Sequence, residues 1–178
     1  TIQKTDHLLV AEKGYVEEIP FIQKHKFLVL ENKSLYKKDR ENSRSESPKD
    51  LIFTGNLSVN SGILTAIKIY ESIKEKLPTA ELLIIGHCPD SSFRKTLLSK
   101  VKSTKGITLK TDIEPIPYHQ IKDAITHADL AIVSYDINPS NQHCIPTKVF
   151  EYISLELPFI CEAGSKWEKY SKTSNMGF

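Results

Sequence analysis

The last two-thirds of the chain alternate short apolar runs with segments of helical period, and this alternation constrains the fold more than any other feature. The runs have strand length and are Leu51–Phe53, Leu82–Ile85, Ile107–Leu109, Leu130–Val133 and Pro158–Cys161. Their continuous apolarity is typical of strands covered on both faces of a parallel sheet. The segments between them repeat apolar residues every three to four positions, as helices do. The pattern predicts an α/β domain with a Rossmann-like, doubly wound parallel sheet.

The first 50 residues predict a different organisation. An apolar run at His7–Ala11, a helical stretch near Val16–Gln23 and a second run at Phe27–Leu30 indicate a strand, a helix and a strand. Residues 31–50 then hold 11 charged residues, too many for a packed core. We therefore predict a short unit at 1–31, a charged linker at 32–50 and the α/β domain at 51–178. Because the first residue is not Met and no final helix closes the sequence, we expect a piece of a longer polypeptide.

Composition excludes several classes of function. The 178 residues carry 24 basic and 22 acidic side chains, a net charge of +2 without the one-sided field that nucleic acid attracts. Apolar runs stay far below the ~20 residues of a membrane span, and the first residues do not resemble a signal peptide. Three cysteines without a CxxC spacing favour reduced thiols. We expect a cytoplasmic protein, although an enzyme at the inner face of a membrane would have the same composition.

Ligands of an open parallel sheet bind at the carboxyl ends of its strands, so the residues that follow each run are the first candidates. Gly55 and Gly86 each occupy such a position, where a missing side chain admits a ligand to the backbone. Tight turn geometry alone is an equal explanation for either glycine. Neither loop has a GxGxxG or GxxxxGK[ST] pattern, which disfavours a dinucleotide oxidoreductase and a P-loop enzyme.

A second candidate is the start of the helix predicted at Lys148–Leu155, with Pro146 in its first turn. The free N–H groups of a helix start and the charge of Lys148 together suit a phosphate. Glu151 lies one turn further on the same side and could accept hydrogen bonds from sugar hydroxyls. The alternative is an ordinary Lys–Glu pair on a solvated helix surface.

Histidines and cysteines add little to these two candidates. His87 and His143 follow strand ends and could reach a ligand, whereas the other four histidines have no partners at ligand spacing. The sequence shows neither a metal-ligand cluster nor a nucleophile-elbow motif, so we expect no metal site.

Five sequence blocks are similar to those of a known family. They are LIFTGNLS, SGILTAIKIYESI, AELLIIGH, ITHADLAIVSY and IPTKVFEYISLELPFI. In this order and spacing, the stretch Leu51–Gly164 resembles the C-terminal, donor-binding domain of GT-B glycosyltransferases of the group 1 type (family 4). The first unit, 1–31, is similar to the last strand–helix–strand of that family's acceptor domain, which precedes the linker between the two domains.

The resemblance implies a role for each candidate. Glu151 would hold the ribose, and Gly55 with the loop after it would lie against the diphosphate. The loop from His143 to Thr147 would face the sugar and phosphates, with Lys148 assisting. The expected catalytic residues are His143 and Lys148. The expected substrate-binding residues are Gly55, Asn56, Gly86, His87, Thr111, Ile113, Thr147, Lys148 and Glu151, of which Gly86, His87 and Thr111–Ile113 flank the nucleobase.

The resemblance also implies a reaction. Such enzymes transfer a sugar from a nucleotide-diphosphate sugar to a glycan, lipid or small-molecule acceptor, with retention of configuration and without a metal, often in cell-envelope or polysaccharide biosynthesis. Expected partners are the nucleotide sugar, an unknown acceptor and the remainder of the acceptor domain, with no nucleic acid. Membrane contact, if any, would be peripheral and made by parts outside this chain. Since the active site of the family is a cleft between two domains, we expect the chain alone to be inactive.

The sequence departs from the family at three places. An Arg and a Lys that usually reach the diphosphate are replaced by Asn56 and by Asn60 or Ser61, and the earlier of two glutamates falls on His143. A non-catalytic nucleotide- or carbohydrate-binding module of the same fold therefore remains an alternative. A sugar-nucleotide epimerase of the same fold is a further alternative, disfavoured because the PTKVFEY block resembles a transferase.

Overall fold

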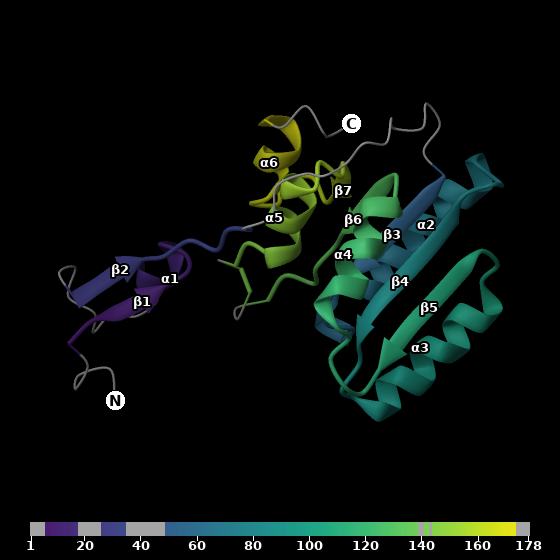
Figure 1. Ribbon diagram of the computed structural model, residues 1–178, viewed down its shortest axis with the longest axis horizontal. Coiled ribbons are helices and arrows are strands. Elements are labelled where there is room, and N and C mark those ends of the chain that lie inside the picture. Colours follow the sequence, from purple (N-terminus) through teal and green to yellow (C-terminus); the bar gives the residue numbers. More distant parts are fainter. Residues whose placement is uncertain (1–5, 18–25, 35–48, 139–140, 143, 174–178) are drawn as a thin grey trace.

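The computed structural model describes residues 6–17, 26–34, 49–138, 141–142 and 144–173 (Figure 1). From residue 50 onward, strands and helices alternate as predicted. The strands are β3 (Asp50–Thr54), β4 (Glu81–His87), β5 (Ile107–Asp112), β6 (Leu130–Val133) and β7 (Phe159–Cys161). The helices are α2 (Ile63–Lys76), α3 (Ser91–Ser103), α4 (Tyr118–His127), α5 (Thr147–Ser154) and α6 (Glu168–Thr173), with a short 3-10 turn at Val59–Ser61.

The five strands form one parallel sheet in the order β5-β4-β3-β6-β7. From β3 the chain moves outward through β4 to β5 and then returns to the other side of β3 with β6 and β7. The order therefore reverses between β3 and β6. In an open α/β sheet this switch point leaves a crevice at the carboxyl ends of the strands, where ligands bind. The predicted fold class is confirmed.

Alternate residues of the central strands face two separate cores. Leu51 and Phe53 of β3 pack with α2 and α3 in one apolar cluster. Ile52, between them, packs with α4 and α5 in the other cluster. Figure 1 shows the same arrangement, with α2 and α3 on one face of the sheet and α4 on the opposite face. Both faces of β3 are thus covered, which explains its uninterrupted apolar sequence.

Local signals set the helix boundaries. The Asp90 carboxylate caps α3, accepting hydrogen bonds from the N–H groups of Ser92 and Phe93 at 2.8 and 3.1 Å. At α5 the prediction was one residue early, since Pro146 is the residue before the helix, with extended backbone (φ −60°, ψ 134°), and Thr147 is the first helical residue. Proline is tolerated at this position because the residue that caps a helix start has non-helical backbone angles.

The first unit contains β1 (Leu8–Val10), α1 (Gly14–Glu17) and β2 (Phe27–Val29). β1 and β2 pair in parallel as a separate two-stranded sheet, in agreement with the predicted strand, helix and strand. The helix begins two residues before the predicted Val16, and residues 18–25 lie outside the described part. Leu9 and Leu28 are about 60% exposed, as expected of a sheet whose apolar face has no covering layer among the described residues.

Two further observations concern the rest of the chain. Past β2, the Ser34 hydroxyl accepts a 2.8 Å hydrogen bond from the Ser154 hydroxyl and so joins the start of the predicted linker to α5. Residues 35–48 of that linker lie outside the described part. Every helix within the described ranges is too short or too polar to cross a lipid bilayer.

Candidate functional site

Two glycines shape the carboxyl ends of β3 and β4. Gly55 directly follows β3 with φ +116°, a conformation that favours glycine. A Cβ built on Gly86 would overlap the carbonyl oxygen of Gly55. Gly86 therefore lacks a side chain where the Gly55 backbone packs against it. At Gly55, the space that a side chain would fill faces Lys148, whose Nζ lies 3.6 Å from where a Cβ would be. The two glycines serve different purposes, which their similar sequence positions could not show.

A third glycine closes the switch point. Gly62, just before α2, has φ +72°, and a Cβ there would overlap the backbone of Ser134, which follows β6. The Ser134 hydroxyl donates a 2.8 Å hydrogen bond to the Gly62 carbonyl oxygen. This contact fixes the start of α2 against the end of β6, so the loops after β3 and β6 form adjacent walls.

Lys148, in the first turn of α5, points into the molecule and not into solvent. Its side chain is only 4% exposed, and its Nζ lies 4.0 Å from the ring centroid of Phe53 and 5.0 Å from that of Tyr135. The ammonium makes no hydrogen bond to any residue that the structure describes. The alternative of a solvated surface pair is therefore wrong, because the lysine is enclosed by two aromatic rings and the backbone of Gly55.

This enclosure changes the charge of the lysine. Burial lowers the pKa of Lys148 from 10.5 to about 7, and the nearby Glu151 carboxylate opposes this shift only in part. Removal from water disfavours the ammonium because the two rings return only part of its lost hydration. At neutral pH the group is thus partly protonated, whereas the sequence predicted a full positive charge.

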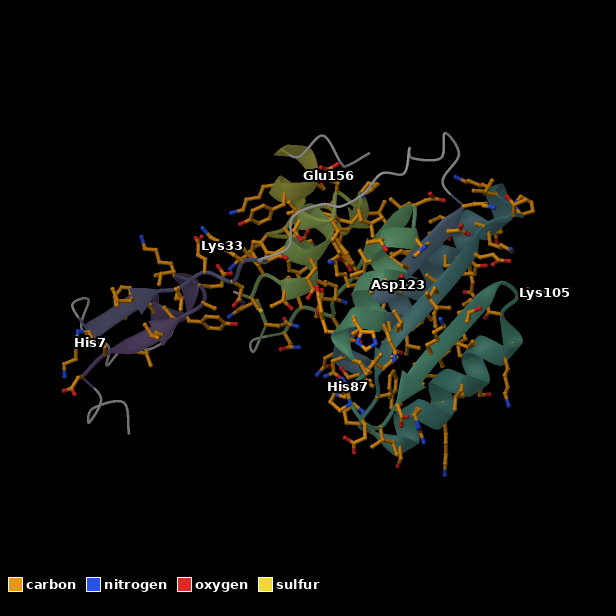
Figure 2. The ribbon with its side chains drawn as sticks, viewed as in Figure 1. His7, Lys33, His87, Lys105, Asp123 and Glu156 are labelled. Atoms are coloured by element: carbon orange, nitrogen blue, oxygen red, sulfur yellow. The ribbon has the colours of Figure 1, made fainter. Side chains whose placement is uncertain are left out.

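Glu151 lies one turn along α5 and is half-buried. Burial raises the pKa of its carboxyl, while the positive charge of Lys148 opposes this effect. Glu151 and Thr147 line a pocket of about 350 Å³ together with Tyr118 and Phe150, and residues 32–34 form its other side. Figure 2 shows Lys33 beside α5 at this place. The structure thereby unites Thr147, Lys148 and Glu151 at the start of one helix.

The residues predicted to flank a nucleobase lie on the neighbouring strands. His87, labelled in Figure 2, is the last residue of β4. In the pairing of β4 with β5, Thr111 lies beside Gly86 and Asp112 lies beside His87. The Thr111 hydroxyl is buried and has no hydrogen-bond partner among the described residues, whereas Ile113 is 48% exposed. These residues share one end of the sheet with Gly55, and their role stays a prediction.

Asn56 lies in a second, smaller pocket at the switch point. This pocket has a volume of about 340 Å³ and is lined by Asn56, Ser58, Asn60, Ser61, Tyr135, Asn138 and Asn141. Its walls are the loops after β3 and β6, which are adjacent because of the strand order. The Asn and Ser residues that replace the expected Arg and Lys therefore line one hollow, with side chains that are polar and uncharged.

Sequence reasoning missed Tyr135. Its ring contacts the Lys148 ammonium, and its backbone N–H donates a 3.2 Å hydrogen bond to the Glu162 carboxylate. Trp167 packs edge-on against the ring at 5.8 Å between centroids. Burial raises the pKa of Tyr135 to about 12, so the phenol stays protonated. Only its position in the loop after β6, one residue beyond Ser134, was a signal in the sequence.

Two predictions are not decided by the structure. His143, expected to be catalytic, lies outside the described residues. Within the described ranges, groups of three or more His, Cys, Asp or Glu side chains that could hold a metal ion do not occur. The absence of a metal from the reaction remains a prediction.

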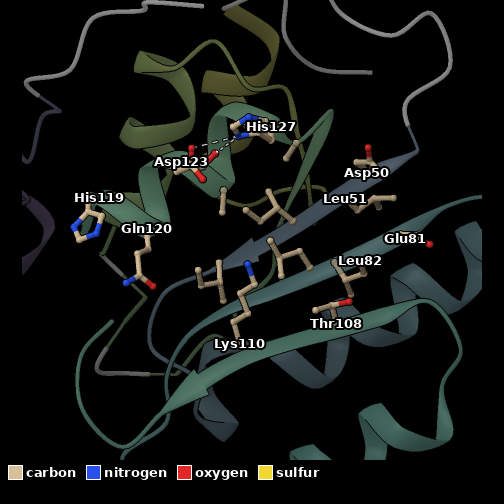
Figure 3. A pocket seen from close by; sticks show the side chains of 15 residues that line it. Asp50, Leu51, Glu81, Leu82, Thr108, Lys110, His119, Gln120, Asp123 and His127 are labelled. Carbon is tan, nitrogen blue, oxygen red and sulfur yellow. Dashed lines mark hydrogen bonds and ion pairs between the residues drawn. The ribbon is translucent and has the colours of Figure 1, made fainter. Parts of the chain in front are cut away.

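A larger pocket, of about 760 Å³, is lined by none of these candidate residues. It is a groove between α4 and the face of β3–β5, with Asp123 and His127 of α4 on one side and Lys110 of β5 on the other (Figure 3). Asp50 and Glu81, at the amino ends of their strands, also line it. Since no candidate residue lines this groove, we place the candidate site at the carboxyl ends of the strands despite its smaller pockets.

Solved structures share this fold. The chain is similar to the pneumococcal O-GlcNAc transferase GtfA in complex with UDP and GlcNAc, with a TM-score of 0.64 and 18% identity over 90% of this chain and 31% of that one. It is also similar to TarM of S. aureus (TM-score 0.61, 10% identity, 90% of this chain and 30% of that one). The third is the catalytic domain of starch synthase IV from Arabidopsis thaliana, bound to ADP and acarbose. Its TM-score is 0.59, with 13% identity over 90% of this chain and 40% of that one. The chain thus spans about a third of the length of these enzymes.

Sequence comparison is more specific. No curated protein matches the chain. The sequence profile described as "Glycosyl transferases group 1" matches residues 48–169, which include all five strands of the main sheet and the helix that carries Lys148 and Glu151. The match covers more than half of the chain, and the strand order, the switch point and the two glycines at its edge agree with it. The chain therefore belongs to the group 1 family of glycosyl transferases.

Proposed function

We propose that this chain forms the donor-binding part of a glycosyltransferase that takes a sugar from a nucleotide-diphosphate sugar, with retention of configuration and without a metal. Glu151 would hold the ribose, and Lys148 with the N–H groups at the start of α5 would bind the diphosphate and stabilise it as it departs. His143 would act beside Lys148. Thr147 would contact the phosphates, and Gly86, His87, Thr111 and Ile113 would surround the base.

One observation carries the proposal. The ammonium of Lys148 is buried at the carboxyl edge of β3, next to Gly55, without a hydrogen-bonding partner among the described residues. A buried ammonium without a hydrogen-bonding partner is destabilising, and the nearby Glu151 carboxylate offsets this effect only in part, so a bound anion would stabilise it. The UDP and ADP bound to GtfA and to starch synthase IV are anions of the required kind.

A second candidate is supported by Asn56 and Asn60. Asn56 stands where the Arg is expected, and Asn60 or Ser61 where the Lys is expected, which leaves Lys148 as the buried cation of the site. A module that binds a nucleotide or carbohydrate without turnover would keep Glu151 and Lys148 and lack the missing pair. Binding experiments on this chain test both candidates, and sugar transfer by the complete polypeptide separates them.

The location of the protein follows the same reasoning. Cys88, Cys144 and Cys161 are free thiols, which favours a reducing compartment. We place the protein in the cytoplasm, where nucleotide sugars would serve as donors, either in solution or at the inner face of the membrane. The acceptor and the remainder of the acceptor domain would complete the cleft over Gly55 and α5.

The test is a calorimetric titration of the chain with UDP, GDP and ADP, without and then with magnesium. We expect one nucleotide to bind in both conditions. Glu151→Ala should weaken that binding by roughly 1.5–3 kcal/mol, because a carboxylate that accepts ribose hydroxyls makes charge-assisted hydrogen bonds. Glu75→Ala, which removes an exposed carboxylate of α2, is the matched control and should leave the affinity unchanged.

Three outcomes would contradict the proposal. If a folded chain binds none of the three nucleotides, the donor site is wrong. If Glu151→Ala binds as tightly as the wild type, Glu151 does not hold the ribose. If binding requires magnesium, Lys148 is not sufficient as the cation of the site.

A further inference from the structure

The charged side chains of the protein are unevenly distributed, although its net charge is only +2. From Ser91 to Lys105, which spans α3 and the turn after it, the chain has five basic and no acidic side chains. The rest of the chain therefore has a net charge of −3. The neighbouring helix α2 has three lysines and two glutamates, a mixture typical of a solvated helix surface. The one-sided charge of α3 calls for a reason beyond solvation.

The helix dipole explains only part of this charge. A cation near the end of a helix is favourable, which accounts for Lys100 and Lys102 in the last turn. Arg94 and Lys95 lie near the start of α3, where the positive end of the dipole disfavours a cation. Lys100 lies 2.7 Å from a carboxylate oxygen of Glu71, whereas the other cations of α3 form no ion pair with any residue that the structure describes.

The cations without an ion pair lie along the outer face of α3. Residues three and four positions apart share one face of a helix, and Lys95, Leu98 and Lys102 have this spacing. All three are exposed, the leucine by 39%. Lys105 continues this row in the turn after the helix, and we call the four residues the basic stripe. Figure 1 shows α3 along the outer margin of the α/β domain, and Figure 2 shows Lys105 at one end of that margin.

The composition of the basic stripe favours a lipid surface over other anionic partners. Protein interfaces concentrate their binding energy in Trp, Tyr and Arg, and their centres are poor in Lys. Single-stranded nucleic acid stacks its bases on exposed aromatic rings, whereas the one aromatic ring of α3, that of Phe93, is only 7% exposed. Lysines around an exposed leucine suit a membrane, because their ammonium groups can reach lipid phosphates while their methylene chains and the leucine contact apolar groups.

From this arrangement we propose that the basic stripe of α3 docks the protein on a membrane that contains anionic lipid. The ammonium groups of Lys95, Lys102 and Lys105 would lie at the lipid phosphates, with Arg94 beside them, and Leu98 would enter the acyl layer. The inference does not depend on the donor site, and it selects the membrane from the two locations given above. The sequence alone placed any membrane contact outside this chain.

The place of α3 in the fold sets the orientation of the docked protein. Because α3 connects the parallel strands β4 and β5, it runs antiparallel to them beside the sheet. With α3 flat on the membrane, the strands would lie along the membrane surface, and the carboxyl edge of the sheet would point sideways and not into the lipid. Gly55 and Lys148 at that edge would stay accessible, so docking should leave nucleotide binding unchanged.

Co-sedimentation with lipid vesicles tests the proposal. The chain is mixed with vesicles of phosphatidylcholine alone, or with mixed vesicles of phosphatidylcholine and phosphatidylglycerol. At low salt we expect binding to the mixed vesicles to be tighter on the order of 500-fold, since each of the four cations without an ion pair contributes roughly 5-fold near an anionic surface. This binding should weaken steeply with added salt, because salt screens the attraction between exposed charges.

Substitutions assign the binding to the basic stripe. Lys95→Gln/Lys102→Gln should weaken binding to the mixed vesicles by roughly 25-fold, whereas Lys95→Arg/Lys102→Arg should retain it. The matched control is Lys49→Gln/Lys110→Gln, which removes two exposed lysines outside α3 and should weaken binding by roughly 2-fold at most. Leu98→Gln should weaken binding by roughly 3- to 8-fold, because the exposed part of the leucine no longer leaves water. All these positions are exposed, so urea unfolding of each variant should match the wild type.

A soluble acidic polymer separates a membrane from an acidic protein partner. Polyglutamate offers negative charge without an acyl layer, so we expect it to bind the chain more weakly than the mixed vesicles do. Its binding should not respond to Leu98→Gln. If polyglutamate binds as tightly as the mixed vesicles and Leu98→Gln weakens neither, the basic stripe recognises an acidic protein, and the proposed membrane docking is wrong.

Three other results would overturn the docking and leave the proposed function standing. Equal binding to the neutral and the mixed vesicles, or binding to neither, would mean that the basic stripe does not recognise anionic lipid. Equal losses in Lys95→Gln/Lys102→Gln and in its control would make the total charge responsible and not the stripe. Release of the protein from the mixed vesicles by UDP would mean that lipid phosphates occupy the site of Lys148.

Discussion

Replacing Lys148 by methionine should make the protein more stable, although it removes a residue of the candidate site. Methionine has a similar length and no charge, and its sulfur can contact the Phe53 ring that now lies 4.0 Å from the ammonium. Burial lowers the pKa of Lys148 from 10.5 to about 7. One pKa unit corresponds to about 1.4 kcal/mol, so this shift corresponds to a stability loss of at most about 5 kcal/mol near pH 7, which the variant would recover.

The effect has a defined pH dependence. Between pH 7 and 10.5 the unfolded chain keeps the lysine protonated while the folded chain does not, so the unfolded state binds more protons. The stability of the wild type should therefore rise with pH over this window by up to about 1.4 kcal/mol per pH unit. The methionine variant lacks this contribution, and its advantage should shrink steadily from pH 7 toward pH 10.

Urea unfolding at pH 7, 8 and 9 measures both quantities. The fluorescence of Trp167, which is 4% exposed and the only tryptophan, reports the loss of structure near Tyr135. Lys95→Met, at an exposed position of α3, is the matched control and should change the stability by less than about 0.5 kcal/mol. Parallel pH profiles for the wild type and Lys148→Met, or a less stable variant, would refute the account of Lys148 as a desolvated amine.

Two further predictions concern the framework of the site, and both are measured by urea unfolding at pH 7. Gly86→Ala should destabilise the protein by roughly 3 kcal/mol, because its Cβ would overlap the Gly55 carbonyl oxygen and push β4 away from the loop after β3; an alanine variant of wild-type stability would contradict this close packing. Tyr152→Phe should reduce the stability by about 1 kcal/mol, because it breaks the buried 2.9 Å hydrogen bond between the Tyr152 and Thr54 hydroxyls. An unchanged stability there would show that the Thr54 hydroxyl finds another partner.

The sequence was sufficient to predict the framework. All five runs of the main sheet became strands, since a run such as Leu82–Ile85 can be buried on both faces only in the middle of a layered fold. The prediction for α5 was early by one residue, because proline fits both the first turn of a helix and the position before it. Helix limits depend on such local alternatives, whereas strand positions depend on apolar runs that the whole fold supports.

The candidate site was predictable only in part. The position of Lys148 at the start of α5 follows from local sequence. Its burial depends on Phe53, which is 95 positions earlier, and on Tyr135, whose ring contacts it from the loop after β6. The hollow lined by Asn56 and Asn60 similarly needs the loop after β6 as its second wall. Contacts of this kind arise from the strand order, and no periodicity along the chain encodes them.

The burial of Lys148 and the replacement of the usual charged pair by uncharged residues have a common consequence under the proposed function. An exposed Arg and Lys would be charged at all times, so the site would attract anions whether or not a nucleotide sugar was present. Here the main cation has a pKa of about 7 and lies behind Tyr135, so the empty site carries only part of a positive charge. A diphosphate that reached the Lys148 Nζ would favour the ammonium and raise its pKa, so that binding and proton uptake would occur together. The site would then be fully charged only when occupied by its ligand, and ligand binding would offset part of the stability that the free protein loses by burying this lysine.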